Sequence, residues 1–248
     1  MEALTIQNGT VMNDLIDTIA FKRRIVTAGG SLNNVRTGRA LGEPLGITVH
    51  NTGNAAAGAD ALNHAAWLQN VENSDQSYVG VHFFVDAERI VQTLPITEVS
   101  WHAGDGEGPG NTRTISVEIC ETAPYEKCEA NAKVLCAALM LTLGLNRLYT
   151  HQMWNGKYCP HLILDRSDGW ADFTADVNRI LAAATMPAQA APVLDNTASG
   201  WAQEAVDWAL ANRLMVGDAN GDLALHRPMT REEGMVFFYR LTGGVPLQ

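Results

Sequence analysis

Short runs of β-branched and aromatic residues, bounded by polar segments, predict the strands of a sheet in the first 150 residues. These runs lie at residues 46–50, 80–85, 90–94, 114–120 and 148–150. The polar turn at 86–89 makes the second and third runs a hairpin. In the fourth run apolar and polar positions alternate, so Glu118 is expected to project from the face opposite to Val117 and Ile119.

Three further segments repeat apolar residues at helical spacing and predict helices around the sheet. They lie at residues 60–70, 127–143 and 172–184. Gly144 follows the longest of them, where glycine commonly ends a helix. The first has a predicted apolar face of four residues, namely Ala59, Leu62, Ala65 and Ala66.

The segments outside these elements divide the chain. Residues 1–25 are expected to form a short helix or arm, and residues 26–44, rich in Gly, Asn, Thr and Arg, to be irregular. Residues 185–199 have the composition of a linker. Beyond them, residues 200–248 predict a helix, a loop and a helix. The sequence therefore predicts an α/β domain at 1–184, with a mixed central sheet flanked by helices, and a small all-α C-terminal module.

Composition and charge exclude several classes of protein. With 46% apolar and 18% charged residues the chain can bury a core, yet it has no run of about 20 apolar residues that could span a bilayer. The formal net charge of −10 argues against nucleic-acid binding, which needs a basic surface. Residues 1–17 carry no basic stretch before their apolar positions, so we expect synthesis in the cytoplasm without a signal peptide.

Four cysteines, at positions 120, 128, 136 and 159, are spread too thinly over the chain for a disulfide scaffold. This usage indicates a reducing compartment at synthesis. Cys128 and Cys136 fall within a predicted helix, so we interpret them as small core residues.

His50, His151 and Cys159 are candidate metal ligands, because each follows or lies close to the end of a predicted strand. Imidazole and thiolate are donors that zinc prefers, and a catalytic zinc takes three protein ligands and leaves a fourth position for water. Spacing alone leaves two readings open. A histidine after an apolar strand is often a surface or core-edge residue, and Cys159 could be a buried thiol before a proline.

Four segments together resemble the type-2 N-acetylmuramoyl-L-alanine amidases, a family that includes phage endolysins, bacterial autolysins and the peptidoglycan-recognition proteins. They occur in the family's order and span about residues 45–165. The segments are 47–54 (ITVHNTGN), 81–86 with 101–105 (VHFFVD and WHAGD), 115–120 (ISVEIC) and 151–160 (HQMWNGKYCP).

The resemblance implies a zinc ion held by His50, His151 and Cys159. It also implies that Glu118 orients water and moves its proton, and that Lys157, tethered two residues before Cys159, stabilises the developing oxyanion.

Substrate contacts are assigned to His102, in the WHAG segment, and to Asn51 and Trp154. His82 is expected to point into the core or to support the site. His64 and His161 are interpreted as structural or surface residues. Some phage relatives carry a catalytic tyrosine where this chain has Val81, so a mechanism that needs that phenol is in doubt.

Residues 199–242 resemble one S-layer homology repeat, a module that binds secondary polymers of the Gram-positive wall. The Thr-Arg-Glu-Glu stretch from Thr230 and the loop from Gly217 to Asp222 carry this resemblance. Wall-binding residues are assigned as Trp201, Thr230, Arg231 and Glu232. The Asp218-x-Asn220-x-Asp222 triplet lacks the glycine and glutamate of an EF-hand, so a calcium loop is rejected. The alternative is a helical cap packed on the larger domain.

The sequence thus predicts a zinc-dependent peptidoglycan amidase that cuts between N-acetylmuramic acid and L-alanine. The expected partners are peptidoglycan, a secondary wall polymer, and other copies of the chain through the C-terminal module. An endolysin of a phage or prophage, released to the wall by a separate membrane protein, is the favoured origin, and a host autolysin is the other. Two alternatives stay open: a non-catalytic peptidoglycan-binding module, and an amidase of soluble muropeptides.

Overall fold

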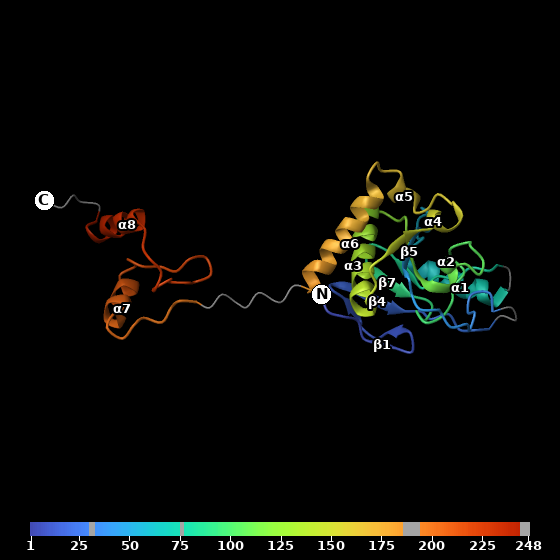
Figure 1. Ribbon diagram of the computed structural model, residues 1–248, viewed down its shortest axis with the longest axis horizontal. Coiled ribbons are helices and arrows are strands. Elements are labelled where there is room, and N and C mark those ends of the chain that lie inside the picture. Colours follow the sequence, from blue (N-terminus) through green and yellow to red (C-terminus); the bar gives the residue numbers. More distant parts are fainter. Residues whose placement is uncertain (30–32, 75–76, 186–193, 244–248) are drawn as a thin grey trace. The chain divides into compact units, whose positions relative to one another are not determined.

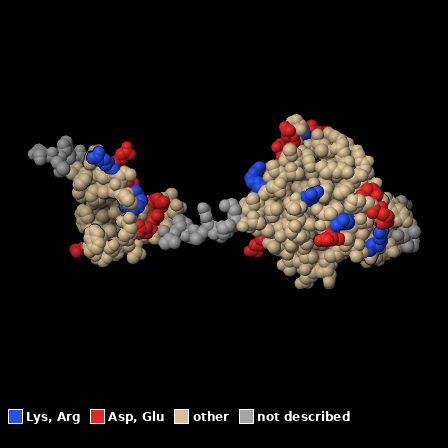
Figure 2. Space-filling model, viewed as in Figure 1, with Lys and Arg blue, Asp and Glu red and all other residues tan. Residues whose placement is uncertain are grey.

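The computed structural model describes residues 1–29, 33–74, 77–185 and 194–243, and the chain separates into two compact units, Met1–Met186 and Pro187–Gln248 (Figure 1). The predicted linker falls largely on residues 186–193, which lie outside the described residues. In the view of Figure 2, acidic and basic side chains are interspersed over the larger unit.

A seven-stranded mixed sheet forms the centre of the larger unit, as predicted. Its pairs are parallel, except for the antiparallel pairs β3–β4 and β6–β7. In spatial order the strands are β3 (Leu15–Ile16), β4 (Ile19–Arg23), β7 (Arg89–Gln92), β6 (Phe83–Val85), β8 (Thr114–Ile119), β5 (Gly46–Asn51) and β9 (Leu148–Thr150).

The prediction of a helix or arm for residues 1–25 is wrong. This segment forms strands β3 and β4 and a separate hairpin of β1 (Ile6–Gln7) and β2 (Thr10–Val11). Asn8 and Gly9 join β1 to β2 with φ values of 48° and 76°. An Asn-Gly pair in the left-handed region is a strong hairpin signal, and the expectation of a helix or arm did not take it into account.

Helices cover both faces of the sheet, and the predicted helices are present with shifted ends. They are α1 (Ala61–Ser74), α2 (Pro109–Arg113), α3 (Tyr125–Leu143), α4 (Gln152–Asn155), α5 (His161–Leu164) and α6 (Gly169–Thr185). Gly144 ends α3 in the left-handed conformation, as predicted. None of the helices in the described ranges is long and apolar enough to cross a membrane.

Alternation along the strands divides the core into two parts. On one side, Ile47 and Val49 of β5 pack with α3 and α6, which lie side by side in Figure 1. Cys128 and Cys136 are buried in this part, as predicted. On the other side, Phe84 of β6 packs with α1. The buried face of α1 is Ala61, Ala65, Leu68 and Val71, so the predicted face is wrong at Ala66, which is exposed.

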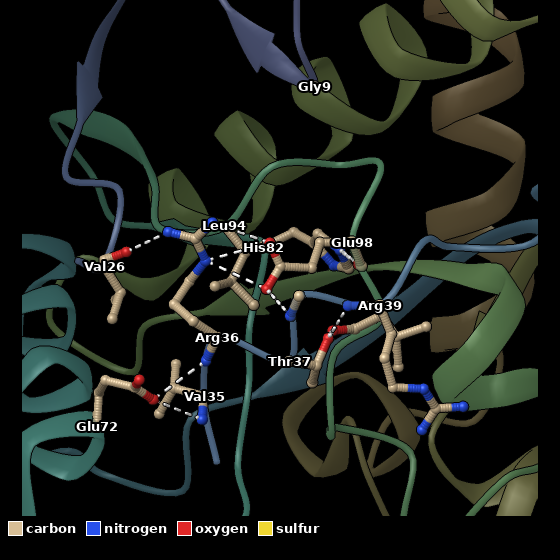
Figure 3. A network of polar contacts seen from close by, with 12 residues as sticks. Gly9, Val26, Val35, Arg36, Thr37, Arg39, Glu72, His82, Leu94 and Glu98 are labelled. Atoms are coloured by element: carbon tan, nitrogen blue, oxygen red, sulfur yellow. Dashed lines mark hydrogen bonds and ion pairs between the residues drawn. The ribbon is translucent and has the colours of Figure 1, made fainter. Parts of the chain in front are cut away.

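A network of buried and partly buried polar contacts fastens the irregular segment after β4 to the sheet and to α1 (Figure 3). The Arg36 guanidinium donates to both carboxylate oxygens of Glu98, at 2.9–3.2 Å, and to the carbonyl oxygen of Val26. The Glu98 carboxylate also accepts the Gly38 N–H. The Glu72 carboxylate of α1 accepts the N–H groups of Val35 and Arg36. These contacts satisfy backbone groups that have no strand partner.

The smaller unit contains α7 (Gln203–Ala211) and α8 (Arg231–Leu241), as predicted. Thr230 and Glu233 form the expected capping box at the start of α8. Large apolar side chains are exposed in this unit, including Trp201 at 90%, and a hollow of about 650 Å³ lies between the loop and α8. The unit therefore buries little apolar surface of its own.

Two glutamates that pair with arginines allow a matched test of this network. Glu98 is buried, whereas Glu107, which pairs with Arg39, is exposed. Glu98→Gln should lower the free energy of unfolding by about 2 kcal/mol, because the buried carboxylate that neutralises the partly buried Arg36 guanidinium is lost. Glu107→Gln should lower it by less than about 1 kcal/mol. Urea unfolding of both variants checks this, and equal losses would contradict the structural role of Glu98.

Candidate metal centre

Three parallel strands end side by side and bring the first site residues together. In the register of the sheet His50 of β5 lies opposite Glu118 of β8, and Val49 lies opposite Thr150 of β9. His151 directly follows Thr150. Because side chains alternate along a strand, His50 and Glu118 face the α1 side of the sheet, away from Val49 and the α3 core.

The third candidate ligand, Cys159, reaches the same point from the loop between α4 and α5. The Cys159 Sγ accepts the Asn51 N–H at 3.4 Å and lies 3.9 Å from the His50 Nδ1. The carbonyl of Cys159 accepts the Gln152 N–H, which fixes the loop against α4. The Nδ1 atoms of His50 and His151 are 3.1 Å apart. One donor atom from each of His50, His151 and Cys159 lies within 4.8 Å of the others, and all three residues are buried.

This arrangement fits a tetrahedrally coordinated metal ion. Metal–nitrogen bonds of about 2.1 Å and a metal–sulfur bond of about 2.3 Å place tetrahedral donors roughly 3.4–3.6 Å apart. The two distances of the His50 Nδ1, 3.1 Å to the other imidazole and 3.9 Å to the thiol, bracket that range. His50, His151 and Cys159 therefore form a metal site, as predicted.

Burial sets the protonation of these ligands. It lowers the pKa of His50 well below its usual range and that of His151 to about 4, so both rings are neutral near pH 7. Neutral imidazole is the form that binds metals. Burial raises the pKa of the Cys159 thiol to about 11. A cation beside the sulfur favours the thiolate and opposes this effect.

Glu118 and Lys157 line one cleft of about 550 Å³ beside the metal site. Burial raises the pKa of Glu118 to about 8, and the nearby Lys157 charge opposes the rise. The Glu118 Oε2 is buried and has no hydrogen-bond partner among the described residues. A carboxylate of this kind is a strong proton acceptor, and it is poised near neutral pH.

The three predicted substrate contacts occupy different positions. His102 is buried, and its Nδ1 lies 3.0 Å from the His50 Nε2. The Asn51 side chain lines the cleft but donates to the Tyr125 hydroxyl and accepts the Leu162 N–H. The Trp154 indole N–H donates to Thr48 Oγ1. Each of these polar groups already has a partner within the protein, and the roles of the three residues in substrate binding stay predictions.

Helix α1 contributes a wall of the cleft that the sequence analysis did not assign. Asn63, His64 and Trp67 line it, and the His64 ring stacks on Phe84 with centroids 5.2 Å apart. The sequence did contain one signal for this wall: Trp67 is a large aromatic residue on the outer side of the predicted helix. It is 47% exposed.

The remaining histidines of the larger unit have structural surroundings. His82 is fully buried, donates from Nε2 to the Glu98 carbonyl, and accepts the Ser116 N–H at Nδ1. It thus belongs to the core, one of the two positions expected for it. His161 lies 3.7 Å from the Glu121 carboxylate.

The predicted wall-binding residues all lie in the smaller unit. Trp201, Arg231 and Glu232 are exposed there. Thr230 caps α8. The wall-binding role of these residues stays a prediction.

A mixed sheet with two histidines at its strand ends, joined by a cysteine from the loop between α4 and α5, defines the larger unit as a metal-site domain. Residues 40–162 match the family described as N-acetylmuramoyl-L-alanine amidase, and the chain belongs to this family. It is 44% identical over 148 residues to the N-acetylmuramoyl-L-alanine amidase XlyA of Bacillus subtilis, covering 58% of this chain and 47% of that relative. It is 44% identical over 165 residues to CwlH of the same organism, covering 64% of this chain and 62% of CwlH.

Solved structures agree with this relation. The catalytic domain of XlyA is 39% identical and has a TM-score of 0.58, and the match covers 64% of this chain and 99% of that domain. PlyL is 33% identical with a TM-score of 0.55, and 97% of it is covered. The chain spans only about half to three fifths of the two full-length relatives, and these matches leave the C-terminal module unassigned.

The raised pKa of Glu118 predicts a pH-dependent stability difference in metal-free protein. A carboxyl group whose pKa is raised by folding stabilises the fold below its ordinary pKa, and this contribution is lost as pH rises through about 8. Glu118→Gln does not titrate. The variant should therefore gain stability over wild type as pH rises from about 5 to about 9.

Denaturant unfolding at several pH values, in the presence of a chelator, measures this difference. The exposed Glu126→Gln serves as control and should stay within about 0.5 kcal/mol of wild type throughout. A Glu118→Gln difference that does not change with pH would show that the buried carboxyl titrates normally.

Proposed function

We propose that this protein is a zinc-dependent N-acetylmuramoyl-L-alanine amidase that hydrolyses the amide bond between N-acetylmuramic acid and L-alanine in peptidoglycan. The observation that carries the proposal is the convergence of His50, His151 and Cys159 beside a cleft lined by Glu118 and Lys157. Membership of the amidase family and the similarity to XlyA and CwlH support it.

Zinc is the metal that this donor set suits best. Two imidazoles and one thiolate favour zinc over calcium or magnesium, which prefer oxygen ligands. Three protein ligands also leave a position open, as in catalytic zinc sites. When bound, zinc supplies Lewis-acid polarisation of a carbonyl group and activation of water at neutral pH.

The side chains of the cleft supply the remaining chemistry. Glu118 accepts the proton of the attacking water and passes it to the departing amine. The raised pKa of its carboxyl suits both steps, because the group must take up a proton and release it near neutral pH. Lys157 carries a positive charge into the same cleft and stabilises the oxyanion that develops on the carbonyl oxygen. Val81 also lines this cleft, so the proposed mechanism uses no phenol at that position.

The alternative of a non-catalytic peptidoglycan-binding module is less well supported. Binding alone has no use for a buried carboxylate oxygen, the Glu118 Oε2, that lacks a hydrogen-bond partner among the described residues, since such an atom lowers stability. Polymeric wall rather than a soluble muropeptide is the proposed substrate because a second unit follows the amidase unit. We further propose an endolysin origin in a phage or prophage, with cytoplasmic synthesis and action at the wall.

Digestion of purified peptidoglycan, with mass analysis of the products, tests the proposed reaction. We expect new L-alanine amino termini and intact lactyl-bearing muramic acid. Glu118→Gln, which keeps the shape of the side chain but accepts no proton, should lose about 100-fold or more in turnover while its zinc content is unchanged. Products cut within the glycan or within the stem peptide would reject the assignment.

For the C-terminal unit we propose wall binding as an S-layer-homology-like module. Its exposed apolar residues, among them Trp201, Trp208 and Phe238, support a role as a binding surface for other molecules. Homo-oligomerisation through this unit would strengthen wall binding, because several weak contacts on one assembly act at a high effective concentration. The proposed domains are the amidase at 1–184, the linker at 185–199 and the module at 200–248.

A chain ending at Thr185 should keep activity on soluble muropeptides but bind and degrade intact walls poorly. Co-sedimentation with walls and light scattering measure the two halves of this prediction, and the full chain with Trp201→Ala is the matched point variant. Equal wall binding with and without the C-terminal unit would reject the anchoring role. A full chain that is monomeric at every concentration would reject the oligomer.

A further inference from the structure

The second nitrogen of His50 points away from the metal site and meets another histidine. Its Nδ1 lies near the other two metal ligands, 3.1 Å from the His151 Nδ1, while its Nε2 lies 3.0 Å from the Nδ1 of His102. The two rings are nearly perpendicular, with centroids 5.1 Å apart. Both residues are buried, with 1% and 8% exposure, so water does not compete for this contact.

Metal binding fixes the direction of this hydrogen bond. The His50 Nδ1 must be unprotonated to bind a metal, so the single proton of the neutral ring sits on Nε2. The Nε2–H then donates to His102, whose Nδ1 is the acceptor. A histidine ligand that is held in this way keeps its tautomer and ring orientation, a role that a carboxylate or a carbonyl group usually fills.

The loop after Trp101 is built to hold His102 in place. The side-chain oxygen of the buried Asn111 accepts the N–H groups of both His102 and Ala103, at 2.8 and 2.7 Å. Asn111 belongs to the short helix α2, whose first N–H groups donate to the Asp105 carboxylate. Asn111 thus holds the two backbone N–H groups that flank the His102 Cα.

We propose that His102 is a positioning residue for the metal ligand His50, and that it acts through an Nε2–H···Nδ1 hydrogen bond rather than through contact with the substrate. The inference rests on the zinc assignment made above for the proposed function. It replaces the substrate-contacting role that the sequence analysis gave to His102, since the ring is buried beneath the metal site.

Two substitutions of nearly equal shape separate the hydrogen bond from packing. Asn at position 102 keeps an acceptor where the histidine Nδ1 lies, and Leu has the same branching without one. In His102→Leu the zinc dissociation constant should rise about 10- to 100-fold, whereas in His102→Asn it should stay within about threefold of wild type. Competition with a chromophoric chelator measures zinc binding without any need for enzyme activity.

Two further variants calibrate this experiment. Cys159→Ser removes a ligand and sets the scale for loss of zinc. His82→Gln alters a buried histidine whose ring lies edge-on to that of His102, with centroids 6.5 Å apart, and whose hydrogen bonds go to Ser116 and Glu98. Because it leaves the His50–His102 hydrogen bond in place, its zinc affinity should stay within about threefold of wild type even if its unfolding temperature falls. Thermal unfolding of the metal-free variants shows that each one is folded. The absorption spectrum of the Co²⁺-substituted protein reports the geometry of the ligands.

Three outcomes would overturn the proposal. Wild-type zinc affinity in His102→Leu, combined with a raised KM for peptidoglycan fragments, would return His102 to substrate binding. Equal losses of zinc affinity in the Leu and Asn variants would assign the effect to packing. Failure of the wild-type chain to bind zinc would remove the basis of the inference. A chain that binds zinc with the predicted Leu–Asn difference but does not cut the amide would instead reject the proposed reaction alone.

Discussion

The parallel pairing of β5 with β8 on one side and β9 on the other is the constraint on which the site depends. Parallel strands in one sheet end at the same edge, so His50, Glu118 and His151 meet there although they are far apart in sequence. A shift of one residue in either pairing would turn a ligand or the carboxylate toward the opposite face, because side chains alternate along a strand. The apolar residues that face α3 hold the register in place.

Burial turns this meeting of side chains into a reactive site. In the apolar surroundings, burial lowers the pKa of the imidazoles and raises that of the Glu118 carboxyl. Each shift arises because the charged form of the group loses its contact with water. Burying these groups therefore lowers the stability of the fold. A bound cation offsets that cost, because it favours neutral imidazole ligands and a thiolate. Metal binding and folding of the larger unit are therefore coupled.

The two units differ in how they are stabilised. The larger unit has a two-sided core and a polar network around Arg36 and Glu98 that fastens its irregular segment. The smaller unit has two short helices and a loop, with Trp201 and other large apolar side chains exposed. The metal site thus lies in the unit with the larger core, while the smaller unit leaves much of its apolar surface exposed.

The sequence by itself determined the main strands and helices of the sheet domain and, through resemblance, the three metal ligands. It could do so because strands, helix ends and ligand segments are local patterns. The catalytic roles of Glu118 and Lys157, which line one cleft, stay predictions. The sequence analysis missed the N-terminal strands, although the Asn8–Gly9 pair is a hairpin signal, and it misjudged one residue on the face of α1.

Only the tertiary structure decided that the His102 ring lies behind His50, that α1 forms a wall of the cleft, and that Glu118 lacks a partner among the described residues. These properties depend on contacts between segments that are not neighbours in sequence, such as His50 with His102 and His64 with Phe84. No local pattern encodes them, because burial and the direction of a hydrogen bond are set by packing across the whole unit.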